Sequence, residues 1–217
     1  THTYGNDQAS AMLWYHDHAL HVTRLNVYAG LAGFYVVRDA DDRQLINSLA
    51  LHPTTFTASA SRRPERELPL LVQDCNLDVD SAGNLAGTLV HKVDSGDGPM
   101  EFFGPFTMVN KQIWPKATVR RRQYRLRWLN GSNARTYRLR LIADAANPAA
   151  RRVVPWADVA TVIGTDGGLR GSPIPADDAL LLAPAERLDL IVDFAASALN
   201  GVTTLTVVNT AEAPFGT

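Results

Sequence analysis

Short β-type runs separated by turn-forming residues constrain the fold of this chain more than any other feature. Runs rich in β-branched and aromatic residues are bounded by Gly, Pro, Asn and Asp along almost the whole sequence. Strands this short and this regularly interrupted predict an all-β sandwich or barrel. The runs that we expect to form strands are Met12–His18, Gly33–Arg38, Leu68–Val72, Gln123–Leu129, Thr136–Leu141, Val159–Thr165, Leu180–Leu182, Leu188–Phe194 and Thr203–Val208.

Helical signal is sparse, and the stretch Ala19–Ala32 is the best candidate for a helical turn or a short helix. Residues 40–67 change in composition, because charged runs at both ends enclose a segment rich in Thr, Ser and Ala. Such a segment is typical of a surface linker or loop between two units. Asp144–Arg152 contains Ala, Asn and Pro, and we expect it to be an insertion at the tip of a hairpin.

The bulk composition excludes several classes of protein. Hydrophobic residues make up 46% of the chain and charged residues 20%, which suits a globular protein with a packed core. The net charge of −1 gives no global attraction to nucleic acid or to an anionic membrane. No apolar run approaches the ~18 residues of a membrane-spanning helix, and no signal-peptide pattern is present. The chain starts at Thr1 inside a segment of folded character, so we expect it to be part of a longer protein.

The segment Trp14-Tyr15-His16-Asp17-His18 carries the strongest functional signal. On a strand, His16 and His18 would point to one side and Asp17 to the other. Their spacing of roughly 6–7 Å, from a rise of ~3.3 Å per residue, suits two adjacent metal ions better than one. The alternative is that one or both are ordinary, partly buried histidines with backbone partners.

The residues around this pair strongly resemble the second histidine motif of the multicopper oxidases, from Leu13 to Gly33. The likeness is to the branch of bacterial spore-coat laccases, bilirubin oxidases and phenoxazinone synthases. Later segments resemble the middle domain of that family, nearly to the end of the chain. They are Pro69–Asp74, Val109–Pro115, the arginine-rich hairpin Arg125–Arg135, Thr165–Gly168, Leu182–Arg187 and Val208–Phe215.

The resemblance implies cupredoxin domains, a type 1 copper that takes single electrons from a reducing substrate, and a trinuclear copper cluster that reduces dioxygen to water. In that family both histidines of this motif bind the type 3 copper pair, one on each ion. The resemblance therefore assigns His16 and His18 as type 3 copper ligands. Imidazole is a suitable nitrogen donor for copper, and Asp17 would support the ligands from outside.

The chain departs from the family in the remaining copper ligands. It has no His-x-His-Gly before the pair, and neither His-x-x-His-x-His nor His-Cys-His after it. We therefore expect the chain alone to be inactive. The single Cys75 has no adjacent histidine and excludes a disulfide framework, so we expect a buried or half-buried thiol. His2 could bind adventitious metal, whereas His21, His52 and His91 are expected to be solvated or structural.

Residues 116–140 contain nine Lys and Arg and no Asp or Glu. A nucleic-acid surface is one interpretation. We favour amphipathic strands, because acidic residues elsewhere balance the charge and no stacking motif is present. Tyr124, Leu126 and Trp128 would then share one face, and Arg125 and Arg127 the other. We expect these arginines to pair with carboxylates across domain contacts.

These observations together predict an all-β fold, a cupredoxin-like Greek-key β-sandwich. Residues 1–40 would be the C-terminal part of a first cupredoxin domain, with the type 3 copper motif, and residues 41–67 a linker. Residues 68–209 would be a second cupredoxin domain with no copper of its own, and residues 210–217 the start of a linker to a third domain.

By this resemblance, the parent protein couples one-electron oxidation of phenolic or aminophenolic substrates to four-electron reduction of dioxygen to water. Its partners would be a small aromatic substrate, dioxygen, and the missing first- and third-domain segments or other chains, with neither nucleic acid nor membrane. One alternative is a truncated, non-enzymatic cupredoxin module with a structural or interaction role. The resemblance suggests an extracytoplasmic or spore-associated location, which the sequence itself does not establish.

Overall fold

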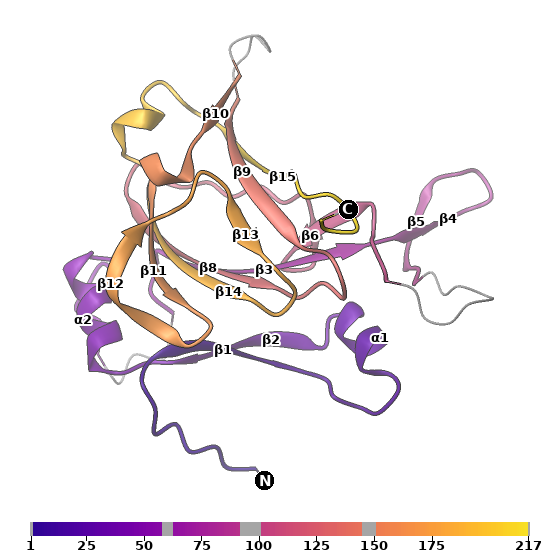
Figure 1. The fold of residues 1–217 in the computed structure, drawn as a ribbon, viewed down its shortest axis with the longest axis horizontal. Helices are drawn as coiled ribbons and strands as arrows, with labels where there is room; N and C mark the ends of the chain where they lie inside the picture. The colour runs from indigo at the N-terminus through magenta and orange to yellow at the C-terminus, as the bar shows by residue number, and fades with distance from the viewer. Residues whose placement is uncertain (1, 58–62, 92–100, 145–150, 217) are drawn as a thin grey trace.

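The computed structural model describes residues 2–57, 63–91, 101–144 and 151–216, and these residues form mainly β-strands (Figure 1). The larger sheet has the strand order β12-β11-β14-β8-β3-β6-β7. Its strands are β3 (Glu67–Cys75), β6 (Phe106–Val109), β7 (Gln112–Ile113), β8 (Gln123–Asn130), β11 (Ala160–Thr165), β12 (Gly168–Pro175) and β14 (Arg187–Asp193).

A second sheet is centred on β9 (Tyr137–Ala143), which pairs with all three of its other strands. Together the two sheets form the sandwich that encloses the main hydrophobic core. The other strands of this second sheet are β10 (Arg152–Val154), β13 (Leu180–Leu182) and β15 (Leu205–Asn209).

Two smaller antiparallel pairs and a few helical segments complete the described chain. The pair β4–β5 extends away from the sandwich, and the pair β1–β2 runs beneath the larger sheet (Figure 1). No helix in the described ranges is long and apolar enough to cross a membrane. These elements are β1 (Ala11–His16), β2 (Ala32–Val37), β4 (Leu77–Val79), β5 (Leu85–Leu89), α1 (Thr23–Tyr28), α2 (Ala40–Ser48), and the 3₁₀ turns η2 (Trp156–Asp158) and η3 (Ser197–Leu199).

The main core forms where alternate residues of facing strands meet. In β9 the side chains of Tyr137, Leu139 and Leu141 are buried, and Arg138 between the first two is exposed. In the larger sheet, Leu126 and Trp128 of β8 belong to the same core cluster. Burial of each such large side chain contributes about 1.5–3 kcal/mol, so the alternation fixes which face of each strand turns inward.

The topology agrees with the predicted Greek-key sandwich. β3 lies between β8, with which it pairs parallel, and β6, with which it pairs antiparallel. Each of the predicted strands overlaps an observed one, and the predicted short helix corresponds to α1. Resemblance indicated a strand at Val109–Pro115, where β6 ends and β7 lies. The sequence did not reveal β4, β5, β10 or β12, because most are short or exposed and lack clear alternation.

The expected surface linker contains a packed helix, α2, so the prediction of a loop is wrong there. Asp39 caps this helix, its carboxylate accepting a hydrogen bond from the Asp42 backbone N–H (2.9 Å). Ile46 and Leu51 are fully buried against the outer face of the larger sheet, beside Ile163 and Ile191. Composition alone does not reveal this packing, because the few apolar residues that produce it are spaced within a polar segment.

Two turn predictions have different outcomes. Arg125–Arg135 is not a hairpin, because β8 lies in the larger sheet and β9 in the smaller one. The chain crosses between the sheets there, and the side chain of Asn130 donates to the carbonyls of Arg135 (2.7 Å) and Leu182 (2.9 Å). Residues 145–150 of the expected hairpin tip lie outside the described residues, although the flanking strands β9 and β10 do pair antiparallel.

Candidate metal centre

The two candidate ligands lie at one end of the β1–β2 pair, which we call the histidine ribbon. The strands pair antiparallel, with His16 opposite Ala32 and Trp14 opposite Phe34. The rings of Trp14 and His16 lie 4.5 Å apart between centroids. The tryptophan therefore covers one side of the His16 ring and restricts its rotamers.

His16 and His18 lie side by side, as alternation predicts. Their ring centroids are 5.8 Å apart and the ring planes differ by 29°. β1 ends at His16, but the Asp17 backbone N–H still donates to the Leu31 carbonyl (3.0 Å), so strand pairing extends past the first histidine. His16 is half-buried and His18 is exposed, which leaves both rings accessible to an ion.

A backbone hydrogen bond fixes the tautomer of His16. Its Nδ1 lies 2.7 Å from the carbonyl oxygen of Asp17. Because a carbonyl can only accept, Nδ1 carries the proton and the neutral ring presents the lone pair of Nε2. Metal-ligating histidines are oriented in this way, by a hydrogen bond from the other ring nitrogen.

Asp17 lies between the two histidines in the chain, and its carboxylate is held by two donors. Its Oδ2 accepts from the side chain of Asn26 (2.9 Å) and from the backbone N–H of Ala19 (3.1 Å). The bond from Asn26, followed by that from Ala19, lowers the pKa of the Asp17 carboxyl below its ordinary value. The carboxylate is therefore ionised at neutral pH beside the two histidines.

Helix α1, which follows the histidines, is fixed to the sandwich. The buried amide of Gln73 in β3 donates to the carbonyls of Val27 (3.1 Å) and Gly131 (3.0 Å). The hydroxyl of Tyr28 donates to the Val90 carbonyl (2.8 Å) and accepts from the Asn76 backbone N–H (3.0 Å). These contacts give the C-terminal end of α1 a defined place on the sandwich.

The other histidines occupy different environments. His21 is exposed, and His52 makes local contacts with Thr54. The ring of His91 stacks on Phe102, with 4.8 Å between centroids. Cys75 is fully buried, as expected, and burial raises the pKa of its thiol, with Asp74 adding to the rise. Within the described residues no group of three or more His, Cys, Asp and Glu side chains could hold a metal ion.

The arginines of β8 face a buried cluster of charges rather than solvent. Three arginines and three carboxylates come together from α2, β3, β8, β14 and the end of β2, so positive and negative charges are equal in number. We call this set the charge cluster. Its members are Arg38, Asp42, Glu67, Arg125, Arg127 and Asp189.

Close contacts compensate the burial of this cluster. Arg125 donates through Nε and Nη2 to the two carboxylate oxygens of Asp189 (2.8 and 2.6 Å) and through Nη1 to Asp42 (2.6 Å). Burial alone would raise the pKa of Asp42, but the guanidinium groups of Arg125 and Arg127 outweigh it and lower that pKa. Glu67 has a lowered pKa for the same reason, with Arg127 as its main partner. The prediction that these arginines pair with carboxylates is confirmed.

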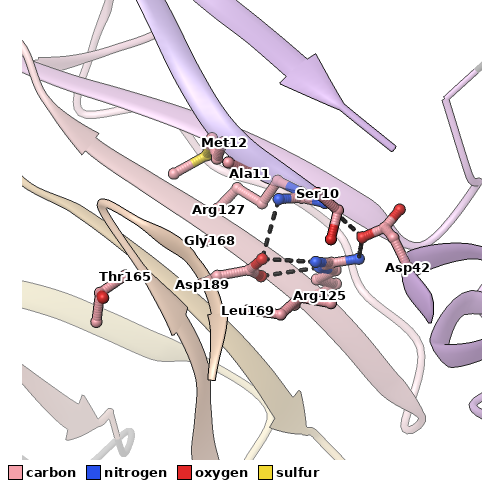
Figure 2. Close-up of a pocket in the computed structure, with 10 residues that line it drawn as sticks. All are labelled: Ser10, Ala11, Met12, Asp42, Arg125, Arg127, Thr165, Gly168, Leu169 and Asp189. Carbon is pink, nitrogen blue, oxygen red and sulfur yellow. Dashed lines mark hydrogen bonds and ion pairs between the residues drawn. The ribbon is translucent and has the colours of Figure 1, made fainter. Parts of the chain in front are cut away.

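The histidine ribbon crosses directly over the charge cluster. Ser10, Ala11 and Met12 pass above Arg125, Arg127 and Asp189 (Figure 2), and all three are buried. At the same place a Cβ on Gly168 would lie 2.5 Å from the Ser10 carbonyl oxygen. Arg187 of β14 donates through Nε to the Met12 carbonyl (3.2 Å). The beginning of β1 is thus packed tightly on the sandwich, and its end carries the histidines.

Comparison with known proteins agrees with this architecture. The laccase of Bacillus stratosphericus is 36% identical over 198 residues, which are 89% of this chain and 33% of that protein. The laccase of Bacillus subtilis is 35% identical over 196 residues. No protein-family model matches the chain. Among solved structures, the McoA multicopper oxidase of Aquifex aeolicus aligns with a TM-score of 0.65 and 33% identity, covering 86% of this chain and 34% of that one.

This chain is homologous to a segment of the multicopper oxidases. It spans about a third of the length of the curated relatives that it matches. The laccase of Pediococcus acidilactici also aligns, with a TM-score of 0.64 and 26% identity over 94% of this chain. The fold is that of the cupredoxin-type multicopper oxidases, as the sequence predicts.

Sequence reasoning missed two parts of the site. Asp42 was assigned to a linker, although a strand with two buried arginines requires buried carboxylates opposite it. Asn26 lies within the resembling stretch, but no pattern in the sequence shows that it contacts Asp17. Both contacts join segments that are brought together only by the fold.

Proposed function

We propose that this chain supplies one histidine ligand to each copper ion of a type 3 pair in a copper-dependent oxidase. His16 and His18 are the proposed ligands. The parent enzyme would couple one-electron oxidations of phenolic or aminophenolic substrates to the reduction of dioxygen to water, with four electrons and four protons per dioxygen molecule. The proposal rests on the side-by-side placement of the two imidazoles, whose ring centroids are 5.8 Å apart.

The donor set fits copper. Imidazole nitrogen suits copper, and the fixed tautomer of His16 leaves Nε2 free to bind. Copper, when bound, supplies the one-electron redox chemistry that no side chain here provides. The chain's own residues orient the two rings: Trp14 packs against His16, and the Asp17 carbonyl holds its Nδ1 proton.

Homology to laccases supports the oxidase, and the partial ligand set supports a chain that is inactive by itself. The whole reaction needs the remaining cluster ligands and the type 1 site, which in this family lie in other segments. The Pediococcus and Bacillus relatives are named as laccases, and the phenolic substrate class proposed here follows from that likeness.

Anaerobic titration with copper(I), in competition with a chromophoric chelator, tests the ligand assignment. All variants carry His2→Ala, which removes adventitious binding near the N-terminus. We expect His16→Ala and His18→Ala each to weaken copper(I) binding at least about tenfold. His21→Ala and His52→Ala are the matched controls and should leave the affinity unchanged. Equal affinity in all four variants would refute the assignment and favour a non-enzymatic module.

A second measurement applies to a protein that joins this chain to the remaining copper ligands. We expect His16→Ala to abolish oxygen reduction there while the substrate still bleaches the blue band of the type 1 copper. Retained oxygen turnover would contradict the type 3 role of His16.

A further inference from the structure

Three residues beside the histidine pair form a closed ring of hydrogen bonds. The Asp17 backbone N–H donates to the Leu31 carbonyl (3.0 Å), and the Leu31 N–H donates to the Asn26 carbonyl (2.9 Å). The side-chain amide of Asn26 then donates to Oδ2 of Asp17 (2.9 Å). Asn26 thus contributes two bonds to the ring: its backbone carbonyl accepts from Leu31, and its side-chain amide donates to Asp17.

This ring lies between the sandwich and the histidines. On one side, Asn26 precedes Val27, whose carbonyl is held by the buried amide of Gln73. On the other side, Asp17 separates the two histidines, and its carbonyl accepts the Nδ1 proton of His16. A displacement of Asp17 would therefore rotate the peptide that orients the His16 ring.

We propose that Asn26 is a positioning residue for the histidine pair, because its amide holds Asp17 in the orientation that presents Nε2 of His16 to copper. This inference rests on the proposed function, in which His16 and His18 are copper ligands. The hydrogen-bonded ring itself is independent of any metal. Asn26 does not touch the ion, so its effect passes through Asp17.

The chemistry of the contact allows a reciprocal exchange of the two side chains. In Asn26→Asp, two carboxylates face each other at hydrogen-bond distance, and like charges repel there. In the double variant Asp17→Asn with Asn26→Asp, the new amide nitrogen donates to the new carboxylate, which restores the bond between residues 17 and 26. The Ala19 N–H loses its acceptor at that position, because both bonds in the original chain use Oδ2 of Asp17. The net charge of the double variant equals that of the original chain.

The first experiment uses the metal-free, 217-residue chain at a pH where imidazole is neutral. Long-range ¹H–¹⁵N NMR of the histidine rings reports the tautomer of His16. We expect a single Nδ1–H tautomer in the original chain, a mixture of tautomers in Asn26→Asp, and recovery of the single tautomer in the double variant. Asp17→Asn alone should keep the tautomer, because its oxygen can still accept both hydrogen bonds.

The second experiment measures copper(I) affinity with the same competing chelator. We expect Asn26→Asp to lose about tenfold, in the range found for groups that support metal ligands, and the double variant to recover. Asn84→Asp is the matched control, because Asn84 also donates its side-chain amide to an aspartate, Asp80 (3.3 Å), in the exposed β4–β5 turn. It should change neither the tautomer nor the affinity.

The outcomes separate this inference from the proposed function. A single His16 tautomer and full affinity in Asn26→Asp, or failure of the folded double variant to recover, would overturn the positioning role. Should Asn26→Asp fail to fold, Asp17→Ala removes the same bond at the surface without adding charge, and it should show the same mixture of tautomers; an unchanged tautomer there would also overturn the role. A copper(I) affinity that is unchanged in His16→Ala and His18→Ala would overturn the proposed function alone, because the tautomer is measured in the absence of copper.

Discussion

Asp42→Asn is the most informative single perturbation of the charge cluster. The Asp42 carboxylate is fully buried and lies within ion-pair distance of three guanidinium groups, those of Arg38 (2.7 Å), Arg125 (2.6 Å) and Arg127 (3.2 Å). Asparagine has nearly the same shape, so the change removes charge without opening a cavity. Three arginines would then share two carboxylates, which leaves one buried positive charge uncompensated.

The size of the effect follows from that imbalance. Removing one partner of a buried ion pair costs about 3–5 kcal/mol, because the remaining charge stays out of water. A domain is stable by only about 5–15 kcal/mol, so the variant should lose a large share of its free energy of unfolding. We do not expect the much smaller effect of exposed pairs, about 0–1 kcal/mol, since no member of the pairs around Asp42 is exposed.

Guanidinium chloride unfolding, followed by tryptophan fluorescence, measures this loss. Trp128 and Trp156 are buried in the main core and report its exposure. Asp41→Asn is the control, because Asp41 precedes Asp42 on the same helix and is exposed; we expect a change within about 0.5 kcal/mol. If Asp42→Asn lowers the free energy of unfolding by less than about 1 kcal/mol, with an unchanged dependence on denaturant concentration, the reasoning is refuted. That result would imply that water or structural relaxation screens the charges of the cluster.

Three further predictions use the same unfolding assay. The buried carboxylates of Asp42 and Glu67 have lowered pKa values, so they stabilise the fold fully only at a pH above the pKa of the same groups in the unfolded chain. The free energy of unfolding should therefore fall as the pH drops below about 4; a free energy that does not change in acid would contradict this. Gly168→Ala should cost about 1–3 kcal/mol, because its φ is +119° and the new Cβ meets the Ser10 carbonyl, whereas Gly167→Ala has open space and should be neutral. Gln73→Leu removes the donor to the buried Gly131 carbonyl and leaves the Val27 carbonyl with only the Gly30 N–H, so it should cost about 1–3 kcal/mol, unlike Gln112→Leu at an exposed site.

The parts of the fold that the sequence predicts are those that local alternation determines. Leu126 and Trp128 alternate with Arg125 and Arg127 along β8, and the two sets do lie on opposite faces. α2 was not predicted, because its helical structure depends on the Asp39 cap and on the burial of a few apolar side chains among polar neighbours. Composition averages over that segment and hides the positions that matter.

The candidate site also has some features that the sequence predicts and others that it does not. The side-by-side placement of His16 and His18 follows from the two-residue period of a strand, and the observed ring spacing agrees with it. The contacts of Asn26 and Gln73 could not be predicted, because each depends on where a helix settles relative to a distant strand. Tertiary hydrogen bonds of this kind leave no periodic trace in a sequence.

The charge cluster has a consequence for how this protein can be divided or recombined. Arg125 and Arg127 belong to the strand at the centre of the larger sheet, yet one of their main counter-charges, Asp42, lies far earlier in the chain. A chimera that joined this sandwich to a foreign leading segment would bring mismatched charges into a dry interior. A crossover placed before Arg38 would therefore keep Arg38, α2 and the strands from β3 onward together, with their charges matched.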